Sequence, residues 1–420
     1  GWFECSLKEG GSVVFSASLS QEETAGLKRR FTSGVKAIGE ITGYRDQLRR
    51  CADSLITDHN GRKKISAGLT WMYTGLLRET LVSLAGLSLY GLDSPKMFEE
   101  ILDNLIADQQ ERLFRRTTQV EAPLYMACTL QDYIDYGADE KAVWKKYGVI
   151  MRGIIESYLP GERAEIAMQP NGLLWAQKDG TALTWMNAYS NGCPVTERAG
   201  YQVETNALWY NAICFVLEME EKYGTKKSQF VGKWSAIRDL VKANYQETFW
   251  NAERGCLADY VDNAGQNMDI RPNQLCPLAC KYSPLDEELT PSILRVVSNE
   301  LVTSRGIRTL SPRDSKYKGV YEGTQIDRDL AYHQGCTRPC LLEPYVKVAL
   351  NVKGPSFVKK AESLVEGFYE DLGQHGVGAF SELYDGDPPH APHGAISSAL
   401  STAALLSVER MLDKYREDGK

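Results

Sequence analysis

The feature that most constrains this chain is the recurrence of apolar residues at intervals of three and four, which is typical of amphipathic helices. The clearest apolar stripes lie within residues 97–106, 231–245 and 358–372. Similar patterns run through residues 22–55, 66–90, 119–136, 139–159, 203–223, 286–304, 339–352 and 394–415. Almost no segment among them shows the period of two that a half-buried strand needs. The sequence therefore predicts an all-α body of about a dozen helices.

Four long polar connections, rich in aromatic residues, separate these helices: residues 160–202, 250–284, 304–334 and 373–394. Structureless loops of this length inside a compact domain usually carry function. We therefore predict paired helices closed into a ring, an (α/α)6 toroid, with the loops gathered at one end around a funnel-shaped pocket. An open helical-repeat solenoid is the alternative, and the absence of a fixed repeat period argues against it.

The first 21 residues differ from the rest of the chain. Residues 2–7 and 12–17 have the composition of two short strands around a turn at residues 8–11. A lone hairpin does not stabilise itself, so it has to pack against something else. We expect residues 1–21 to be the β-hairpin remnant of a preceding β domain and residues 22–420 to form the helical domain.

Charge and hydropathy exclude several classes of partner. The chain carries 48 basic and 55 acidic side chains, a net charge of −7, without a sustained basic run. Nucleic acid and anionic membrane surfaces are therefore not expected as partners. The longest strongly apolar stretch, residues 81–92, is interrupted by Gly86 and Ser88 and is too short to cross a bilayer.

Ten cysteines are scattered at irregular spacing, which in a chain this long is typical of reduced thiols in the cytoplasm. Two spacings raise the alternative of a four-thiolate zinc site, Cys276-x3-Cys280 and Cys336-x3-Cys340. Both are wider than the usual CxxC spacing. Pro277 follows the first cysteine of one pair, and Pro339 precedes the last cysteine of the other. We expect a cytoplasmic protein without metal or other cofactor.

Acidic and aromatic residues of the long loops are the candidates for chemistry. The chain has no HExxH, P-loop or GxSxG segment, and its five histidines include no helical pair at metal-binding spacing. The first and last loops, with the start of the helix that follows the first loop, hold the candidates Trp175, Trp185, Asn187, Glu197, Arg198, Glu204, Glu382, Asp385 and Asp387. Pyranose rings stack on aromatic faces, and their hydroxyls need planar groups with several hydrogen-bonding atoms. This composition indicates a sugar site, and glycoside hydrolysis needs two carboxyl groups there.

Each candidate also has a structural interpretation. Trp175 and Trp209 fit the protein core, and Glu204 lies where it complements a helix dipole. The Asp385-Gly386-Asp387 segment is a good turn in its own right. Glu382 lies between Phe380 and Leu383 in a segment with the composition of buried chain. A carboxylate at such a position has to be paired or functional.

The order of several segments resembles the glucosidase domain of glycogen debranching enzymes, the amylo-α-1,6-glucosidase family, which is related to glucoamylases on an (α/α)6 barrel. The resemblance covers nearly everything after residue 22. It is carried by Thr184-Trp185-Met186, by Val203-Glu204-Thr205-Asn206-Ala207-Leu208-Trp209-Tyr210, by Tyr332-His333-Gln334-Gly335 and by Glu382-Leu383-Tyr384-Asp385-Gly386-Asp387-Pro388-Pro389-His390. In bacterial members a β domain precedes the barrel, which agrees with the expected hairpin remnant.

The resemblance implies inverting hydrolysis of the α-1,6-linked glucose left at a glycogen branch point. The family's general base is the glutamate that is Glu382 here, and its general acid is an aspartate directly after Thr-Trp-Met, where this chain has Asn187. An amide has no carboxylic proton to give. Asn187 and Glu382 are expected to face each other across the pocket. The other residues expected to surround the sugar are Arg78, Glu79, Glu121, Trp175, Trp185, Glu197, Arg198, Glu204, Tyr332, His333, Asp385 and Asp387.

Other positions also depart from the family pattern. An acid one methylene longer stands at Glu79, Glu121 replaces an aspartate, and His393 replaces an arginine. Two aromatic residues are lost from the segment Cys336-Thr337-Arg338-Pro339-Cys340. Several departures together favour a divergent subfamily with a remodelled pocket over a single inactivating substitution.

Three interpretations of Asn187 remain open: an inactivating substitution of an aspartate, replacement of the acid by Glu197 or Glu204, or loss of hydrolysis with retained sugar binding. The first hypothesis for the whole chain is a debranching-type α-glucosidase, and the second is a catalytically impaired relative that binds carbohydrate. An unrelated helical toroid such as a terpene cyclase is the third, and the chain lacks the DDxxD or DxDD motif that it needs.

Overall fold

The computed structural model describes residues 2–18, 21–38, 40–115, 119–224, 229–376 and 378–418. The chain divides into two compact units, Gly1–Gln47 and Leu48–Lys420. In the part of the chain that the structure describes, no helix is both long enough and apolar enough to cross a membrane.

The smaller unit contains helix α1 (Leu27–Ile38) and the expected hairpin segment. A turn forms there, closed by a hydrogen bond of 2.8 Å from the Gly11 amide to the Lys8 carbonyl. The rings of Phe3 and Phe15 lie 5.8 Å apart on either side of the turn. The described residues 2–18 contain no strand, which differs from the hairpin that the sequence predicts. Their assignment to a preceding β domain stays a prediction.

The larger unit is built mainly from helices, and helix α2 (Tyr44–Leu55) leads into it. The following helices are α3 (Leu77–Leu84), α4 (Pro95–Asp108), α5 (Gln110–Phe114), α6 (Tyr125–Tyr136), α7 (Glu140–Glu156), α8 (Val203–Tyr223), α9 (Gln229–Phe249), α10 (Cys276–Ala279), α11 (Thr290–Glu300), α12 (Gln325–Ala331), α13 (Leu342–Lys353), α14 (Val358–Glu366) and α15 (Ala399–Asp418). A π-helix, η1 (Ala85–Gly91), extends α3. Short 3-10 turns are η2 (Ala122–Leu124), η3 (Pro272–Leu275), η4 (Glu287–Leu289), η5 (Pro339–Leu341), η6 (Gly354–Phe357) and η7 (Glu370–Gly373).

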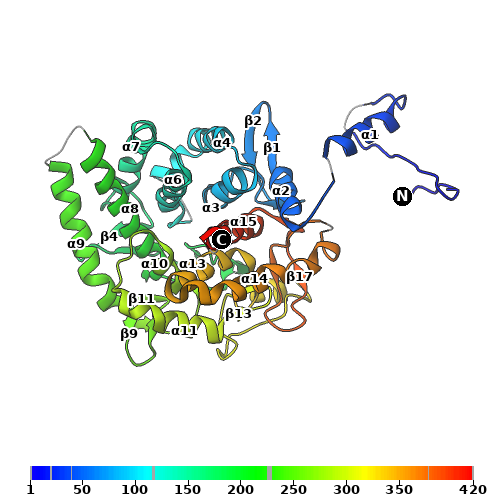
Figure 1. Ribbon diagram of the computed structural model, residues 1–420. Helices are drawn as coiled ribbons and strands as arrows, with labels where there is room; N and C mark the ends of the chain where they lie inside the picture. Colours follow the sequence, from blue (N-terminus) through cyan, green and yellow to red (C-terminus); the bar gives the residue numbers. More distant parts are fainter. Residues whose placement is uncertain are drawn as a thin grey trace. The chain divides into compact units, whose positions relative to one another are not determined.

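Contacts between helices close a ring (Figure 1). Helix α3 packs on α6, α6 on α8, α8 on α10, α10 on α13, α13 on α15, and α15 on α3. A second layer packs against this ring: α4 against α3, α7 and α9 against α8, α11 against α13, and α14 against α15. Two concentric layers of paired helices form the (α/α)6 toroid, so the fold class predicted from the apolar stripes is confirmed.

Most residues of the apolar stripes are buried as expected, although Leu240 of α9 is 43% exposed. In α4 the buried side chains are those of Phe98, Ile101, Leu102 and Leu105. The helix begins at a serine cap, where the Ser94 hydroxyl accepts a hydrogen bond from the backbone amide of the third helical residue. Close packing between helices also requires small residues. A Cβ on Gly86 would lie 2.7 Å from the Cα of Ala403, so glycine allows η1 to approach α15.

Short strands lie in the connections between helices, including the long ones that the sequence predicts as loops. They are β1 (Ile56–His59), β2 (Arg62–Ile65), β3 (Gly68–Leu69), β4 (Ile166–Met168), β5 (Leu174–Ala176), β6 (Tyr189–Ser190), β7 (Cys193–Pro194), β8 (Tyr201–Gln202), β9 (Trp250–Asn251), β10 (Cys256–Leu257), β11 (Tyr260–Asp262), β12 (Gly265–Asn267), β13 (Val302–Thr303), β14 (Gly306–Arg308), β15 (Thr337–Arg338), β16 (Leu383–Tyr384), β17 (Pro392–His393) and β18 (Ser397–Ser398). The largest sheet has the order β13-β14-β15-β16-β17. Its register pairs Thr337 with Tyr384, which brings the chain around residue 338 beside Glu382.

Candidate functional site

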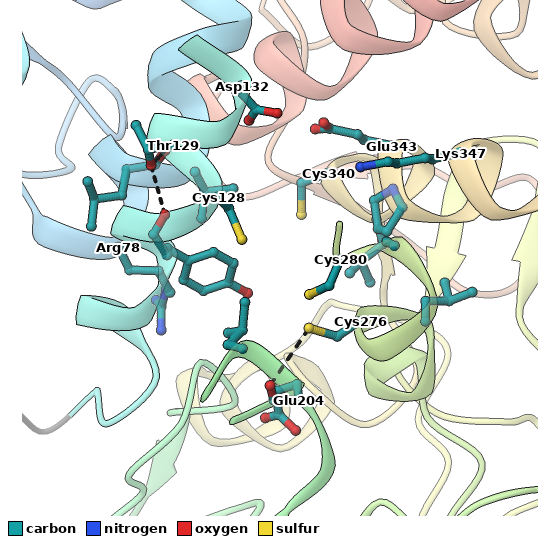
Figure 2. A pocket seen from close by; sticks show the side chains of 18 of the residues that line it. Arg78, Cys128, Thr129, Asp132, Glu204, Cys276, Cys280, Cys340, Glu343 and Lys347 are labelled. Carbon is teal, nitrogen blue, oxygen red and sulfur yellow. Dashed lines mark hydrogen bonds between the residues drawn. The ribbon is translucent and has the colours of Figure 1, made fainter. Parts of the chain in front are cut away.

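A cavity of about 240 Å³ lies inside the ring, and all six helices of the ring contribute to its wall. At one end the wall includes Arg78, Trp185, Glu204 and Asn273. Four cysteines and several aliphatic side chains line the middle. Figure 2 shows the cavity with Arg78 and Glu204 at one end and Asp132, Glu343 and Lys347 at the other.

Arg78 stands in the first turn of α3 and joins two buried carboxyl groups. Its Nη2 lies 2.5 Å from Oε1 of Glu79, and its Nη1 lies 3.3 Å from Oε1 of Glu121. Glu79 is 8% exposed and Glu121 is fully buried, yet the second carboxylate oxygen of each has no hydrogen-bond partner. Burial outweighs the charge of Arg78 and raises the pKa of Glu121 to about 7. The Oε2 atoms of Glu79 and Glu121 are therefore available beside Arg78 for a hydrogen bond to a ligand.

His333 supplies two more unused polar atoms. The ring is 2% exposed, and neither of its nitrogens has a hydrogen-bond partner. Burial lowers its pKa well below the usual value, and the charges of Arg338 and Arg78 act in the same direction. The imidazole is therefore neutral, with one donor and one acceptor to satisfy. The indole of Trp185 meets it edge to face, with ring centroids 5.3 Å apart.

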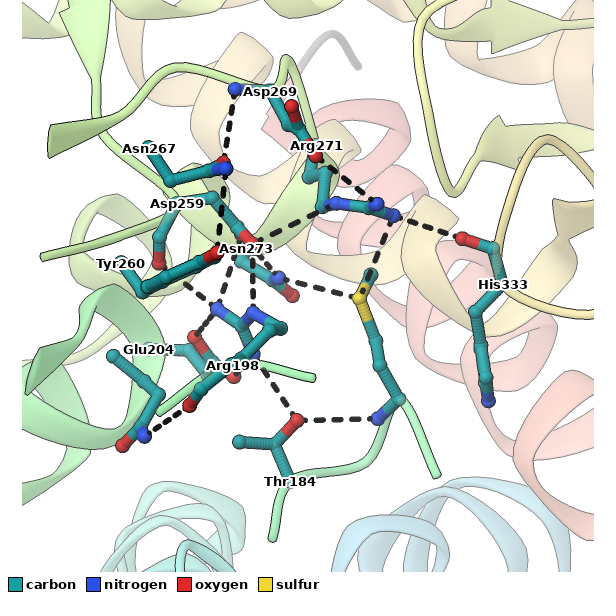
Figure 3. Close-up of polar contacts among 12 residues, drawn as sticks. Thr184, Arg198, Glu204, Asp259, Tyr260, Asn267, Asp269, Arg271, Asn273 and His333 are labelled. Carbon is teal, nitrogen blue, oxygen red and sulfur yellow. Dashed lines mark hydrogen bonds and ion pairs between the residues drawn. The ribbon is translucent and has the colours of Figure 1, made fainter. Parts of the chain in front are cut away.

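Arg198 is the centre of a buried hydrogen-bond network next to the cavity (Figure 3). Its guanidinium donates to both oxygens of Glu204, at 2.7 Å for Oε2, and to both oxygens of Asp259, at 2.7 and 3.0 Å. Asp259 also accepts a hydrogen bond of 2.7 Å from Asn273, which in turn accepts one of 2.7 Å from the Trp185 indole. This buried network fixes the orientation of Trp185. It also leaves both oxygens of Glu204 occupied by Arg198.

Glu382 is held by groups on three different segments. Its Oε1 lies 2.8 Å from Nη1 of Arg338 and also accepts a hydrogen bond from the Tyr332 hydroxyl, and its Oε2 accepts one of 3.1 Å from the Ala395 amide. Burial acts to raise the pKa of Glu382, but Arg338 and these hydrogen bonds outweigh it and lower the pKa below its usual value. The Arg338 guanidinium also stacks 4.0 Å from the ring centre of Tyr332.

Asn187 follows the segment that carries Trp185 and is partly exposed. Its side chain makes no hydrogen bond with the described residues. Arg271 links the segment of Asn187 to the segment of His333. Its Nη1 lies 3.8 Å from the sulfur of Met186, the neighbour of Asn187, and 2.8 Å from the His333 carbonyl. Tyr332, the neighbour of His333, bonds Glu382. The wall of the cavity in Figure 2 includes neither Asn187 nor Glu382.

Of the twelve residues predicted to surround the sugar, three line this cavity: Arg78, Trp185 and Glu204. The following four are among the nine that do not. Trp175 packs edge to face on Tyr201, with ring centroids 4.9 Å apart, and Glu197 is exposed. Asp385 accepts a hydrogen bond of 2.7 Å from the Tyr321 amide, and Asp387 accepts one of 2.8 Å from a tyrosine hydroxyl. The two aspartates fix loops to one another, and a role of these four residues in sugar binding stays a prediction.

Three important residues were not singled out from the sequence as part of the site: Arg338, Asp259 and Asn273. Arg338 is a departure from the family pattern, and a buried arginine in place of an aromatic residue needs a carboxylate partner. Asp259 and Asn273 lie in a long loop, and nothing in their local sequence points to Arg198. Trp209, which the sequence places in the core, is fully buried there.

The cysteines considered for zinc do not all meet. Cys276, Cys280 and Cys340 line the cavity, whereas Cys336 packs in a separate core cluster with Ala331 and Leu383. Within the described ranges, no group of three or more histidine, cysteine, aspartate or glutamate side chains could hold a metal ion.

A closed ring of paired helices with aromatic and carboxyl groups at the end of an axial cavity is the architecture of the six-hairpin glycosidases. The family model described as amylo-alpha-1,6-glucosidase matches residues 50–407, and the chain belongs to this family of glycoside hydrolases. A comparison with curated proteins gives no match.

Three solved structures with the same fold come from Thermus thermophilus. One is described as an uncharacterized conserved protein, with 10% identity, a TM-score of 0.59, and coverage of 87% of this chain and 100% of that chain. The other two are of the GH63 mannosylglycerate hydrolase. In complex with Tris and D-glycerate it has 10% identity, a TM-score of 0.61 and coverage of 87% and 100%. Its Tris complex has 9% identity, a TM-score of 0.61 and coverage of 88% and 100%. At this identity the likeness concerns the fold.

Proposed function

We propose that this chain binds the terminal glucose of an α-glucan, in particular an α-1,6-linked glucose at a branch point, and that it has lost efficient hydrolysis. The glucose would lie at the end of the cavity formed by Arg78 and Trp185. The observation that carries the proposal is a set of buried polar atoms without partners on the residues that contact Arg78 and Trp185: one oxygen each of Glu79 and Glu121 and both nitrogens of His333.

Unpartnered buried polar atoms are costly, and native proteins keep few of them. A sugar hydroxyl both donates and accepts, so a ring of hydroxyls can satisfy carboxyl oxygens and a neutral imidazole together. The indole of Trp185 is fixed by its hydrogen bond to Asn273 and supplies an apolar wall. These groups match the alternating polar edge and apolar face of a pyranose.

Loss of efficient hydrolysis follows from the state of the carboxyl groups. Asn187 cannot donate a proton, and a missing general acid typically costs about a hundredfold to ten-thousandfold in rate. The two candidates to replace it are poorly suited, because Glu204 is bound by Arg198 and Glu197 is exposed. Glu382 in turn is ion-paired with Arg338. Both halves of an acid–base pair are therefore compromised.

Slow inverting hydrolysis of α-1,6-linked glucose is the second candidate, and the lowered pKa of Glu382 favours it. An ionised carboxylate is the form that a general base needs. If Arg338 moves away when substrate binds, Glu382 can take a proton from a water that attacks the anomeric carbon on the face opposite the leaving oxygen. The leaving oxygen would take its proton from solvent water, which makes the reaction slow. Inversion requires the acid and base groups to stand about 6.5–9.5 Å apart.

Calorimetric titration with panose, maltotriose and cellotriose, with glucose release followed in the same samples, separates these functions. We expect saturable binding of the two α-linked sugars, no binding of the β-linked one, and no glucose release. Trp185→Leu should weaken binding at least about tenfold, since an aromatic contact in a sugar site carries much of the affinity. Trp250→Leu, in β9 and outside the cavity wall, is the matched control. Failure of every α-linked sugar to bind would refute the proposal, and glucose release with inversion would support slow hydrolysis.

A cytoplasmic location and a preceding β domain belong to the same proposal. The location is supported by the ten cysteines, all of which are free thiols. An intracellular α-glucan is the partner that this location and the family together indicate.

A further inference from the structure

The far end of the cavity carries charged groups that the sugar proposal does not use. Asp132 on α6 and Glu343 and Lys347 on α13 form this end, together with Asp135 and Lys281. Asp135 and Lys281 pair with each other at 3.6 Å. Figure 2 shows the carboxyl groups of Asp132 and Glu343 on either side of the same space, with Lys347 beside them. This end therefore holds one more acid than base.

Asp132, Glu343 and Lys347 do not pair with one another. Glu343 and Lys347 are four residues apart on one helix, a spacing that normally allows an ion pair. No nitrogen–oxygen distance of 4.0 Å or less joins Lys347 to Asp132 or Glu343, and Asp132 makes no hydrogen bond or ion pair with the described residues. Glu343 hydrogen-bonds Ser407 of α15. The charged groups face the cavity and leave a space between them.

The middle of the cavity is apolar, and thiols form much of its wall. Cys128 lies one turn before Asp132 on α6, and Cys276 and Cys280 lie one turn apart at α10, so the sulfur atoms point into the same space (Figure 2). Hydrogen bonding to Cys280, with burial, raises the pKa of Cys128 well above the usual value, and burial raises that of Cys340 to about 11. Protonated buried thiols behave as small hydrophobic groups with little reactivity.

We propose that this half of the cavity binds a small amine with an apolar body, whose ammonium group lies between Asp132 and Glu343 and whose body lies over the thiols. A sugar is a poor occupant here, because thiols and aliphatic side chains satisfy few hydroxyls. The size is adequate: the whole cavity measures about 240 Å³, whereas one of about 150 Å³ holds a benzene molecule. The proposal does not depend on sugar binding at the other end.

The pH dependence of this binding can be derived from the groups around the site. Burial raises the pKa of Asp132 to about 6 and that of Glu343 to about 8, in the second case with the help of Asp132. An ammonium group favours the ionised form of both, so its affinity should rise as pH increases from 6 to 8 and its binding should release protons. The other charged or titratable groups that face this pair are Lys347, Asp135, Lys281, Tyr90 and Arg410.

Calorimetry with benzylamine and its neutral isostere benzyl alcohol, on the full chain, tests the proposal. We expect benzylamine to bind about tenfold more tightly at pH 8 than at pH 6, and benzyl alcohol to bind weakly at both. Asp132→Asn and Glu343→Gln should each remove most of the preference for the amine. Glu366→Gln, an exposed acid at the end of α14 away from the cavity, is the matched control.

Thermal melting of each variant shows whether it folds. If both variants fail to fold, the wild-type protein still decides the matter, because titrations in phosphate and in HEPES at pH 7 measure the protons released. Equal affinity for benzylamine and benzyl alcohol, no proton release, or no binding of benzylamine at millimolar concentration would overturn the proposal. Panose titrations of the same samples show separately whether the sugar end is intact.

Discussion

Arg338 holds Glu382 through an ion pair of 2.8 Å between Nη1 and Oε1, in the interior of the protein. Arg338 lies in β15, and Glu382 directly precedes β16, the neighbouring strand in the largest sheet. The position of Arg338 is one where the chain departs from the aromatic residue of the resembled family. Under the proposed function, Asn187 lacks the proton that a general acid must give, and Arg338 occupies the carboxylate expected to act as the base. In that proposal the two departures affect the acid and the base of the same chemical step.

Restoring both halves should therefore restore activity more than restoring either alone. We predict that Asn187→Asp and Arg338→Trp give little gain singly, and that the double variant gains at least about a hundredfold in glucose release from panose. The measurement is the initial rate with each variant. Addition of Glu382→Gln to the double variant should abolish the gain. A full gain from Asn187→Asp alone would show that Arg338 does not block the base.

His333→Phe should change binding and stability in opposite directions. The substitution keeps the ring shape and removes two nitrogens that have no partner in the protein. Replacing an unsatisfied polar group with an apolar one is neutral or stabilising, so the melting temperature should stay the same or rise. Affinity for panose should fall roughly tenfold, since hydrogen bonds to the sugar are lost. Unchanged affinity would place the sugar away from His333.

Arg198 should be essential for stability. It is 3% exposed and neutralises Glu204 and Asp259 together. Arg198→Met leaves two buried carboxylates without their main partner, and breaking a buried pair in this way costs about 3–5 kcal/mol. Arg416→Met removes surface ion pairs of α15 and should cost less than about 1 kcal/mol. Chemical denaturation of both variants measures the difference, and similar losses would contradict this role of Arg198.

Stability should decrease as pH rises from 6.5 to 8. The pKa of Glu121 is raised to about 7 and that of Glu343 to about 8, so the folded protein binds more protons than the unfolded chain in this range. Stability then falls with increasing pH. The lowered pKa of His333 acts in the opposite direction only below its usual value of 6.5. Glu121→Gln should flatten the slope of melting temperature against pH, and a slope that rises with pH in the wild-type protein would contradict these assignments.

The sequence predicts the ring because helical periodicity is a local signal that survives in each segment. The stripe of α4 illustrates this, since Phe98, Ile101, Leu102 and Leu105 bury as their spacing requires. Contacts of Arg271 and Tyr332 link the segments of Asn187 and Glu382, but neither residue lines the cavity, so the expectation that they face each other across it stays a prediction.

Partners joined by distant segments could not be derived in the same way. The pairing of Arg338 with Glu382 depends on the register of β15 and β16, which is set by contacts across the sheet. The pairing of Arg198 with Asp259 joins two loops whose paths follow from how they cover the ring. The thiol-lined cavity likewise brings together cysteines from separate helices. The sequence of each helix alone does not indicate that these cysteines meet.

Diffraction from crystals of the wild-type protein soaked in panose tests the central claim most directly. The account predicts an intact trisaccharide whose terminal glucose lies against Trp185, with hydroxyls within hydrogen-bond distance of Arg78, Glu79 and His333, and with Arg338 still on Glu382. A sugar bound elsewhere, or a cleaved glucose at this end of the cavity, would contradict it.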